Sequence, residues 1–230
     1  MKAIIFTDGS SRGNPGNGGY GAIISDGSTV HEIGGKEENT TNNRMEMVAA
    51  LEAIKVLSDD TEAELHTDSA YLINGITKWV FAWQKNNWQT KTKDDVLNVD
   101  LWKELVSVGE DKKIKWIRIS GHSGVPANER CDVIATSFAD GKTIKLFHGP
   151  VSEYKIDLSV TQGTEKAIKS KSNKKAMAYS YVSMVDGNIQ THETWSDTEA
   201  RVKGTSGARF KKSISPEDEL DIIAEFESLR

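Results

Sequence analysis

Short apolar runs alternate with polar turns at the start of the chain. The runs cover 3–7, 20–25 and 30–33, and the segments between them are rich in Gly, Asn, Asp, Ser and Pro. A short apolar run bounded by turn-forming residues is typical of a buried strand. Three such strands joined by short turns predict an antiparallel meander.

Further along, the apolar spacing changes to the helical period. The residues that recur every three or four positions are Met47, Ala50, Leu51, Ile54 and Leu57. They predict a helix, and Asn42 and Asn43 are its expected N-caps. The other elements expected here are strands over 63–67 and 114–119 and helices over 70–88, 98–108 and 131–138. Strands that alternate with helices imply parallel crossovers, so we predict an α/β fold with a mixed sheet flanked by helices.

The pattern fades after the last of these helices, and a smaller unit follows. Residues 149–175 are rich in Ser, Thr, Lys, Gly and Gln, which is typical of a flexible linker. Beyond it, apolar runs around Asp186-Gly187 predict a hairpin. Ser196 is placed to cap a short helix, and another helix is expected from Ser215. We therefore divide the chain into a domain over 1–145, a linker over 146–175 and a small α+β domain over 176–230.

Composition narrows the class of protein. Hydrophobic residues make up 37% of the chain, enough for part of it to bury a core, and the single cysteine, Cys131, excludes an internal disulfide and a cysteine-rich metal site. No apolar run approaches the roughly 20 residues that span a bilayer. The stretch at 3–6 is too short for the core of a signal peptide. We therefore expect a cytoplasmic monomer with no membrane partner.

The charge of the chain is unevenly distributed. The net charge of −5 argues mildly against a nucleic-acid-binding protein. Residues 1–148 contain 17 Lys and Arg against 21 Asp and Glu, and the remaining residues contain 12 against 13. However, 166–175 and 201–213 each have five basic residues and no acidic one. Because phosphate contacts are local, these two runs are candidate nucleic-acid contacts; the alternative is a solvated face or tether.

Two aspartates stand at the ends of predicted strands. Asp8 follows the strand at 3–7, and Asp68 follows the strand at 63–67. If these strands are parallel neighbours, both side chains lie at the edge of the sheet where α/β folds bind ligands. Close carboxylates repel one another unless a cation joins them, and hard cations such as Mg²⁺ prefer oxygen ligands.

Further residues are placed to complete this site. Glu46 lies in the first turns of a predicted helix, and Asp132 lies off the apolar stripe of the last one. Four acidic side chains suit two metal ions about 4 Å apart, which activate a water and stabilise the leaving 3′ oxygen of a phosphodiester. His122, in a loop, is a candidate proton carrier or aid to product release. Taken singly, each residue also fits an ordinary role in a turn, a helix cap or a solvated surface.

The residues around these positions resemble type 1 ribonuclease H over about 1–140. The matching motifs are Phe6-Thr7-Asp8-Gly9-Ser10, Gly13-Asn14-Pro15-Gly16, Gly18-Gly19-Tyr20-Gly21-Ala22, Thr41-Asn42-Asn43-Arg44-Met45-Glu46, Thr67-Asp68-Ser69, and Gly121-His122 through Asn128-Glu129-Arg130-Cys131-Asp132. The resemblance implies a five-stranded mixed sheet and endonucleolytic hydrolysis of the RNA strand of an RNA/DNA hybrid, leaving 5′-phosphate products. It also implies two Mg²⁺ ions, with Mn²⁺ as an alternative. The implied ligands are Asp8, Glu46, Asp68 and Asp132, with His122 as the catalytic loop histidine.

The same resemblance implies substrate contacts. Gly9, Asn14, Asn42 and Asn43 match positions that contact the minor groove of the hybrid, and Thr41 matches a position near a DNA phosphate. Proteins distinguish RNA from DNA through the 2′-hydroxyl, which amide and backbone groups can contact. One region departs from well-known bacterial members. The segment 83–98, a strongly basic handle in those members, has three lysines against two aspartates here, which predicts a weakened handle.

The second domain resembles the small hybrid-binding, or viroplasmin-like, domain. The matching residues are Tyr179-Ser180-Tyr181-Val182, Asp186-Gly187, Thr194-Trp195, Ala200-Arg201-Val202-Lys203-Gly204 and Ala208-Arg209-Phe210-Lys211-Lys212. The residues implied to contact the duplex, either the hybrid or double-stranded RNA, are Trp195, Phe210, Lys211 and Lys212. An aromatic surface beside lysines suits sugar stacking and phosphate contact; the alternative is that Trp195 and Phe210 fill a small core. The domain is more familiar at the amino end of such enzymes, so its position here is a second departure.

Three functions remain open from the sequence. The first is a hybrid-specific ribonuclease with a tethered binding domain. The second is a catalytically silent hybrid-binding protein, and the third is a nuclease of the same fold that acts on DNA alone. The four carboxylates and His122 favour the first, and the asparagine and glycine positions that match hybrid contacts weigh against the third.

Overall fold

The computed structural model describes residues 2–90, 93, 95–121, 124–159 and 178–213, together with 219, 222, 223 and 226. The chain divides into two compact units. The first comprises Met1–Thr77 and Asn98–Lys166, and the second comprises Lys78–Leu97 and Ala167–Arg230. The segment Lys78–Leu97 thus groups with the second unit, although it lies within the predicted first domain. The domain limits at 145 and 176 stay predictions.

The first unit is built on a six-stranded mixed sheet in the order β5-β4-β1-β2-β3-β6. Its strands are β1 (Ala3–Gly13), β2 (Gly16–Ser25), β3 (Thr29–Thr40), β4 (Glu62–Thr67), β5 (Lys113–Arg118) and β6 (His148–Pro150). β1, β2 and β3 form the predicted antiparallel meander, and β4 lies parallel to both β1 and β5. The predicted α/β class with a mixed sheet is confirmed.

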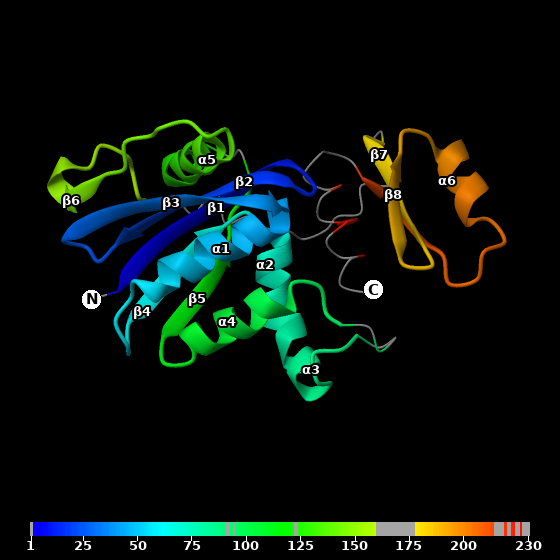
Figure 1. Cartoon of the computed structure of the whole chain (residues 1–230), viewed down its shortest axis with the longest axis horizontal. Helices are drawn as coiled ribbons and strands as arrows, with labels where there is room; N and C mark the ends of the chain where they lie inside the picture. The colour runs from blue at the N-terminus through cyan, green and yellow to red at the C-terminus, as the bar shows by residue number, and fades with distance from the viewer. Residues whose placement is uncertain are drawn as a thin grey trace. The chain divides into compact units, whose positions relative to one another are not determined.

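Helices cover both faces of this sheet. They are α1 (Asn42–Lys55), α2 (Ala70–Asn74), α4 (Val99–Gly109) and α5 (Pro126–Ala139). Figure 1 shows α5 on one side of the sheet and α1 with α4 on the other. Phe6 and Ile23 pack with Cys131 on the α5 side, and because side chains alternate along a strand, Ile5 and Ile24 face α1. Among the described helices, none has the length and apolar character needed to span a bilayer.

Two predicted helices differ from the structure in detail. The N-cap of α1 is Thr41, whose hydroxyl accepts a hydrogen bond from the Arg44 amide at 3.3 Å, so Asn42 and Asn43 are helical residues and not caps. The helix expected over 70–88 is divided into α2, a π-helical turn (Gly75–Trp79) and α3 (Val80–Lys85). Gly75 lies so close to Trp102 that an added Cβ would be 2.0 Å from a ring atom, so no larger residue fits where the turn begins.

The sheet has one strand more than predicted, because β6 pairs antiparallel with β3. This strand lies inside the range predicted as a flexible linker, so that prediction is wrong for its first part. A three-residue strand containing Gly and Pro has too little apolar alternation to be recognised from sequence. The side chains that pack this segment against the sheet are Phe147, Tyr154, Ile156 and Leu158.

Glu32 of β3 holds the same segment in place. Its side chain is 1% exposed and accepts hydrogen bonds from Arg130 Nε at 2.8 Å and Nη2 at 2.7 Å. The Phe147 amide at 2.9 Å and the Tyr154 hydroxyl at 2.8 Å donate to the same carboxylate. Burial raises the pKa of Glu32, but these hydrogen bonds and the charge of Arg130 outweigh it, so the pKa is lowered. We call these residues the Glu32 cluster.

The second unit contains a three-stranded antiparallel sheet in the order β8-β7-β9. The sheet and its helix consist of β7 (Ser180–Val185), β8 (Asn188–His192), α6 (Trp195–Val202) and β9 (Arg209–Ser213). The predicted hairpin is confirmed, since Asp186 and Gly187 both have the positive φ that a tight two-residue turn requires. The core on one face consists of Val182, Met184, Ile222 and Phe226, and Figure 1 shows α6 beside the sheet.

The cap of α6 also differs from its prediction. Thr194 is the N-cap, and its hydroxyl accepts a hydrogen bond from the Asp197 amide at 3.2 Å. The predicted cap, Ser196, is therefore wrong by two residues. The predicted start of the last helix at Ser215 lies outside the described residues.

Candidate active site

The parallel pairing of β1 and β4 brings two of the predicted carboxylates together. The register runs from Ala3 opposite Ala63 to Phe6 opposite His66. Asp8 and Asp68 each stand two residues beyond that last pair, so they extend the same register at one edge of the sheet. Both side chains are half-buried. This geometry follows the expectation drawn from the sequence.

A glycine lets a third carboxylate approach. Gly9 follows Asp8 and lies directly against α1, where an added Cβ would be 2.2 Å from the backbone nitrogen of Glu46. Real side chains do not tolerate such a distance, so only glycine allows β1 and α1 to approach this closely. The consequence is that Glu46, in the second turn of α1, stands next to Asp8.

Three of the carboxylates are held by neighbouring donors. The Gly9 amide donates to Asp8 at 2.7 Å. Asn42 Nδ2 donates to Glu46 at 2.9 Å, and the Ser69 hydroxyl also bonds to Glu46. Asn128 Nδ2 donates to Asp68 Oδ2 at 3.3 Å. These bonds restrict the side chains to one side of the site before any ligand binds.

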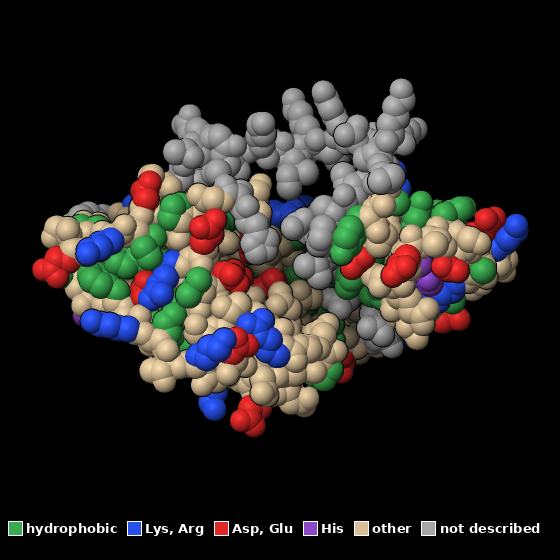
Figure 2. Space-filling model, turned by 90° about the horizontal axis from the view of Figure 1, so that it is seen from above, with side chains coloured by type: hydrophobic (Ala, Val, Ile, Leu, Met, Phe, Trp, Pro, Cys, Tyr) green, Lys and Arg blue, Asp and Glu red, His purple; other side chains and the backbone are tan. Residues whose placement is uncertain are grey.

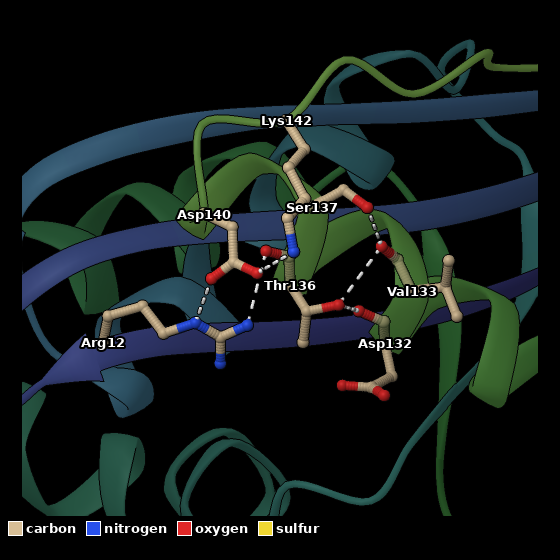
Figure 3. A network of polar contacts seen from close by, with 7 residues as sticks. All are labelled: Arg12, Asp132, Val133, Thr136, Ser137, Asp140 and Lys142. Atoms are coloured by element: carbon tan, nitrogen blue, oxygen red, sulfur yellow. Dashed lines mark hydrogen bonds and ion pairs between the residues drawn. The ribbon is translucent and has the colours of Figure 1, made fainter.

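Asp132 comes from α5, on the face of the sheet that also carries Phe6. The helix is fixed there by Cys131, which is fully buried and whose thiol hydrogen-bonds to the Phe6 carbonyl at 3.3 Å. Figure 3 shows the backbone carbonyl of Asp132 accepting from Thr136 at 2.8 Å, while the Asp132 carboxylate extends away from that contact.

The pKa of Asp8 is affected by the other three carboxylates of the site. Burial raises the pKa of Asp8 well above its ordinary value, and the charges of Asp68, Glu46 and Asp132 raise it further. The hydrogen bond from Gly9 lowers it by a smaller amount. Repulsion of this kind is relieved when a cation binds between the carboxylates.

The donor set fits a hard divalent cation, although the side chains are not already arranged as its ligands. Oxygen donors from carboxylates are what Mg²⁺ and Mn²⁺ prefer. In the part of the chain that the structure describes, no three Asp, Glu, His or Cys side chains form a ready metal centre. The carboxylates are close enough to affect the pKa of Asp8, but three of them also bond to neighbouring groups.

The predicted substrate contacts of the first unit lie around the same edge. Gly9 is buried against α1, and Asn14 is exposed in the turn between β1 and β2. Thr41 caps α1, and Asn42 and Asn43 form its first turn, where they are half-buried. The predicted catalytic histidine, His122, lies outside the described residues.

The predicted contacts of the second unit form an exposed aromatic surface. The ring of Trp195 lies 5.0 Å from that of Phe210 and 5.7 Å from that of Tyr181, measured between centroids. Trp195 is 40% exposed and Phe210 is 48% exposed. Since the core lies on Val182 and its neighbours, the alternative that Trp195 and Phe210 fill the core is wrong.

Basic residues beside this surface have different roles. Lys211 and Lys212 lie on β9 next to Phe210. Arg201, in contrast, donates to the Ser183 hydroxyl at 2.7 Å and to the Asn188 carbonyl at 2.9 Å. The basic run at 201–213 is therefore partly structural, because Arg201 holds α6 against the small sheet.

The first unit has slightly more acidic than basic residues, and its surface shows no dominance of basic side chains on the face in view in Figure 2. Figure 2 shows acidic and basic side chains interspersed on the face in view, without a large basic patch. Several of its basic side chains form ion pairs within the protein, as Lys115 does with Glu64 at 3.0 Å.

Parts of the predicted handle, including Lys91 and Asp94, lie outside the described residues.

Two positioning residues were missed from the sequence. Ser69 and Asn128 hold Glu46 and Asp68, respectively, but their roles depend on contacts between segments far apart in the chain. The sequence signal that could have identified them is that each lies inside a motif that matches the family. Arg130 was missed for the same reason, since its partner Glu32 lies 98 residues away.

Comparisons with known proteins find matches over the first part of the chain. The sequence matches the RNase H family over residues 1–140. It is 49% identical over 136 residues to a ribonuclease H of Acetivibrio thermocellus, covering 59% of this chain and 92% of that protein. It is 47% identical over 140 residues to a ribonuclease H of Novosphingobium aromaticivorans, covering 60% and 98% of the two chains.

A solved structure shares the fold. The crystal structure of LC9-RNase H1, described as a type 1 RNase H with the type 2 active-site motif, has a TM-score of 0.56 and 27% sequence identity. The match covers 64% of this chain and 76% of that one. These matches leave the small second sheet unassigned but cover the part of the chain that contains the four carboxylates. The chain therefore belongs to the ribonuclease H family, whose members are nucleases of RNA/DNA hybrids.

Proposed function

We propose that the chain is an endonuclease that hydrolyses the RNA strand of an RNA/DNA hybrid with two divalent ions and leaves 5′-phosphate products. The observation that carries this proposal is geometric: the parallel register of β1 and β4 places Asp8 beside Asp68, and the close approach of α1 at Gly9 brings Glu46 to them. The ions would be held by these carboxylates and that of Asp132, with Mg²⁺ as the first choice and Mn²⁺ as the alternative. When bound, they would activate a water and stabilise charge on the leaving 3′ oxygen.

The protein's own contribution is to hold the ligands in place. Asn42 and Ser69 restrict Glu46, and Asn128 restricts Asp68. Hydrogen-bonded partners of this kind typically change metal affinity or activity by about 10- to 100-fold when they are removed. His122 is proposed to carry a proton or assist product release, as its place in the matching loop motif implies.

Recognition of the hybrid is proposed to use both units. In the first, the exposed amide of Asn14 and the first turn of α1 at Asn42 and Asn43 would contact the minor groove, while Thr41 would lie near a DNA phosphate. The backbone of Gly9 would complete these contacts. Polar groups of this kind can detect the 2′-hydroxyl that distinguishes RNA from DNA.

In the second unit, the exposed surface of Trp195 and Phe210 is proposed to stack against the duplex, with phosphate contacts from Lys211 and Lys212. The rings would stack on a sugar of the backbone, because the bases of a duplex are already stacked on one another. The exposure of both rings supports this use. Double-stranded RNA is the alternative ligand of this surface. A monomer in the cytoplasm is part of the same proposal.

The test compares three labelled duplexes. The full chain is incubated with RNA/DNA hybrid, duplex RNA and duplex DNA, each with Mg²⁺, Mn²⁺ or chelator. We expect metal-dependent cutting of the RNA strand of the hybrid, with ends that a phosphatase makes resistant to ligation. Cutting that survives chelator would exclude the metal mechanism. Tight hybrid binding without cutting in either metal would favour the catalytically silent alternative.

A further inference from the structure

Arg12 lies on the same face of β1 as the catalytic carboxylate. Side chains four residues apart on a strand point to the same side of the sheet, so Arg12 shares the α5 side with Asp8. The two Cα atoms are separated by about 13 Å along the strand, at roughly 3.3 Å per residue. Arg12 also lies two residues before Asn14, a proposed hybrid contact. It therefore stands between the carboxylates and the substrate-binding turn.

The guanidinium is held from one side only. Its Nε bonds to the carboxylate of Asp140, at the end of α5, and its Nη2 lies 3.5 Å from the Thr136 carbonyl. Lys142 donates to the same Asp140 at 2.8 Å, as Figure 3 shows. A guanidinium has five N–H donors, and no described residue accepts from Nη1. The side chain is 44% exposed, so this free edge is accessible.

Two other arginines of the first unit, Arg44 and Arg130, make more hydrogen bonds within the protein than Arg12 does. Arg44 bonds to both oxygens of Asp100, at 3.0 and 2.8 Å, and to Asn98 at 3.4 Å. Arg130 bonds to both oxygens of Glu32. Arg12 thus combines exposure, a fixed orientation and unused donors, which these two arginines do not.

The charge of Arg12 also reaches the active site. The hydrogen bond to Asp140 is the largest cause of its raised pKa, and the charge of Asp132 is a further cause. Arg12, Asp140 and Lys142 together carry a net charge of +1 beside a site of four carboxylates. A polyanionic strand that approaches those carboxylates needs a cation nearby, and an arginine with a free edge binds phosphate with directed hydrogen bonds.

We propose that Arg12 binds a backbone phosphate of the nucleic acid that flanks the cleaved bond, on the Asp132 side of the site. Asp140 is a positioning residue that keeps the guanidinium turned toward the strand. The inference rests on the proposed function, because it assumes that a hybrid is bound along this edge. It adds a phosphate contact to those proposed for Thr41, Lys211 and Lys212.

The test measures how hybrid binding depends on salt. Full-length Arg12→Ala and wild type are titrated with uncut hybrid in chelator at several salt concentrations. One lost phosphate contact lowers the slope of log affinity against log salt by about 0.9. With metal present, we expect KM to rise about 5- to 10-fold and kcat to change less than about twofold, since the contact is made equally in ground and transition states.

Lys142→Ala is the matched control, because it also removes a positive charge bonded to Asp140. It should keep the wild-type slope and KM. Equal losses in the two variants would mean that Arg12 acts through general charge, and a wild-type slope in Arg12→Ala would overturn the contact. If Arg12→Ala folds poorly, as judged by its melting curve, Arg12→Gln provides the same comparison. Failure of wild type to bind or cut the hybrid would instead refute the proposed function.

Discussion

The carboxylate site of the first unit and the aromatic surface of the second are built in opposite ways. Glu46 and Asp68 are held by hydrogen bonds from other segments, whereas Asp8 is held by the amide of the next residue and lies close to charges that repel it. In the second unit, Trp195 and Phe210 are exposed and contact each other. Carboxylates held close together suit chemistry on a bound substrate, whereas an exposed aromatic surface suits affinity for it. Changes in the two places should therefore separate turnover from binding.

Asp8→Asn should have the largest effect. We expect hybrid cleavage to fall about a thousandfold or more, because the amide supplies no charge to a divalent ion. Binding measured in chelator should change less than about twofold, since phosphate contacts remain. The melting temperature should not fall, because the change removes a carboxylate that its neighbours repel. Single-turnover cleavage, binding titration and thermal unfolding provide the three readouts.

The control for this variant is Asp59→Asn, which removes an exposed acid paired with Lys112. Its cleavage rate should equal that of wild type. Turnover near the wild-type rate in Asp8→Asn would mean that the metal assignment is wrong.

Glu32→Gln should mainly affect stability. The change leaves Arg130 without a charged partner and weakens the bonds from Phe147 and Tyr154. Breaking one side of a largely buried ion pair costs about 3 kcal/mol of unfolding free energy, measurable by urea denaturation. Glu62→Gln, which removes an exposed partner of Lys113, should cost less than about 1 kcal/mol. Similar losses in both variants would show that the Glu32 cluster does not hold the segment after α5.

The effect of Glu32 should also depend on pH, with a definite sign. The folded pKa is lowered, so the stabilisation is complete above the unfolded pKa and is lost as the pH falls through the folded value. The difference between wild type and Glu32→Gln should therefore be largest near neutral pH and shrink below about pH 4. A difference that grows on acidification would contradict the lowered pKa.

Trp195→Ala tests the other side of the comparison. Hybrid affinity should fall about tenfold, as expected for the loss of one stacking partner, while kcat at saturating hybrid stays unchanged. Tyr179→Ala is the control. Tyr179 is 53% exposed, and among the described residues the ring contacts of Trp195 are with Tyr181 and Phe210 instead. A loss of kcat without a loss of affinity would assign Trp195 a role in chemistry.

The sequence predicted the local features of both regions better than their contacts across the chain. The paired positions of Asp8 and Asp68 follow from strand periodicity and a parallel register. The approach of Glu46 depends on Gly9, whose need for a missing Cβ is visible only when α1 is placed against β1. Strand β6 escaped prediction because its pairing with β3, and not its own composition, makes it a strand.

Thr194→Ala should have the smallest effect and would sharpen the assignment of the second unit. Thr194 caps α6 directly before Trp195, so its loss should cost about 1 kcal/mol of stability. Hybrid affinity should fall only about two- to threefold, because fraying of the first turn leaves Trp195 less fixed. Ser196→Ala is the matched control, since the sequence pattern favours Ser196 as the cap but the structure places it inside the helix. Chemical denaturation and binding titration should show a loss for Thr194→Ala alone; a loss confined to Ser196→Ala would move the start of α6 two residues along the chain.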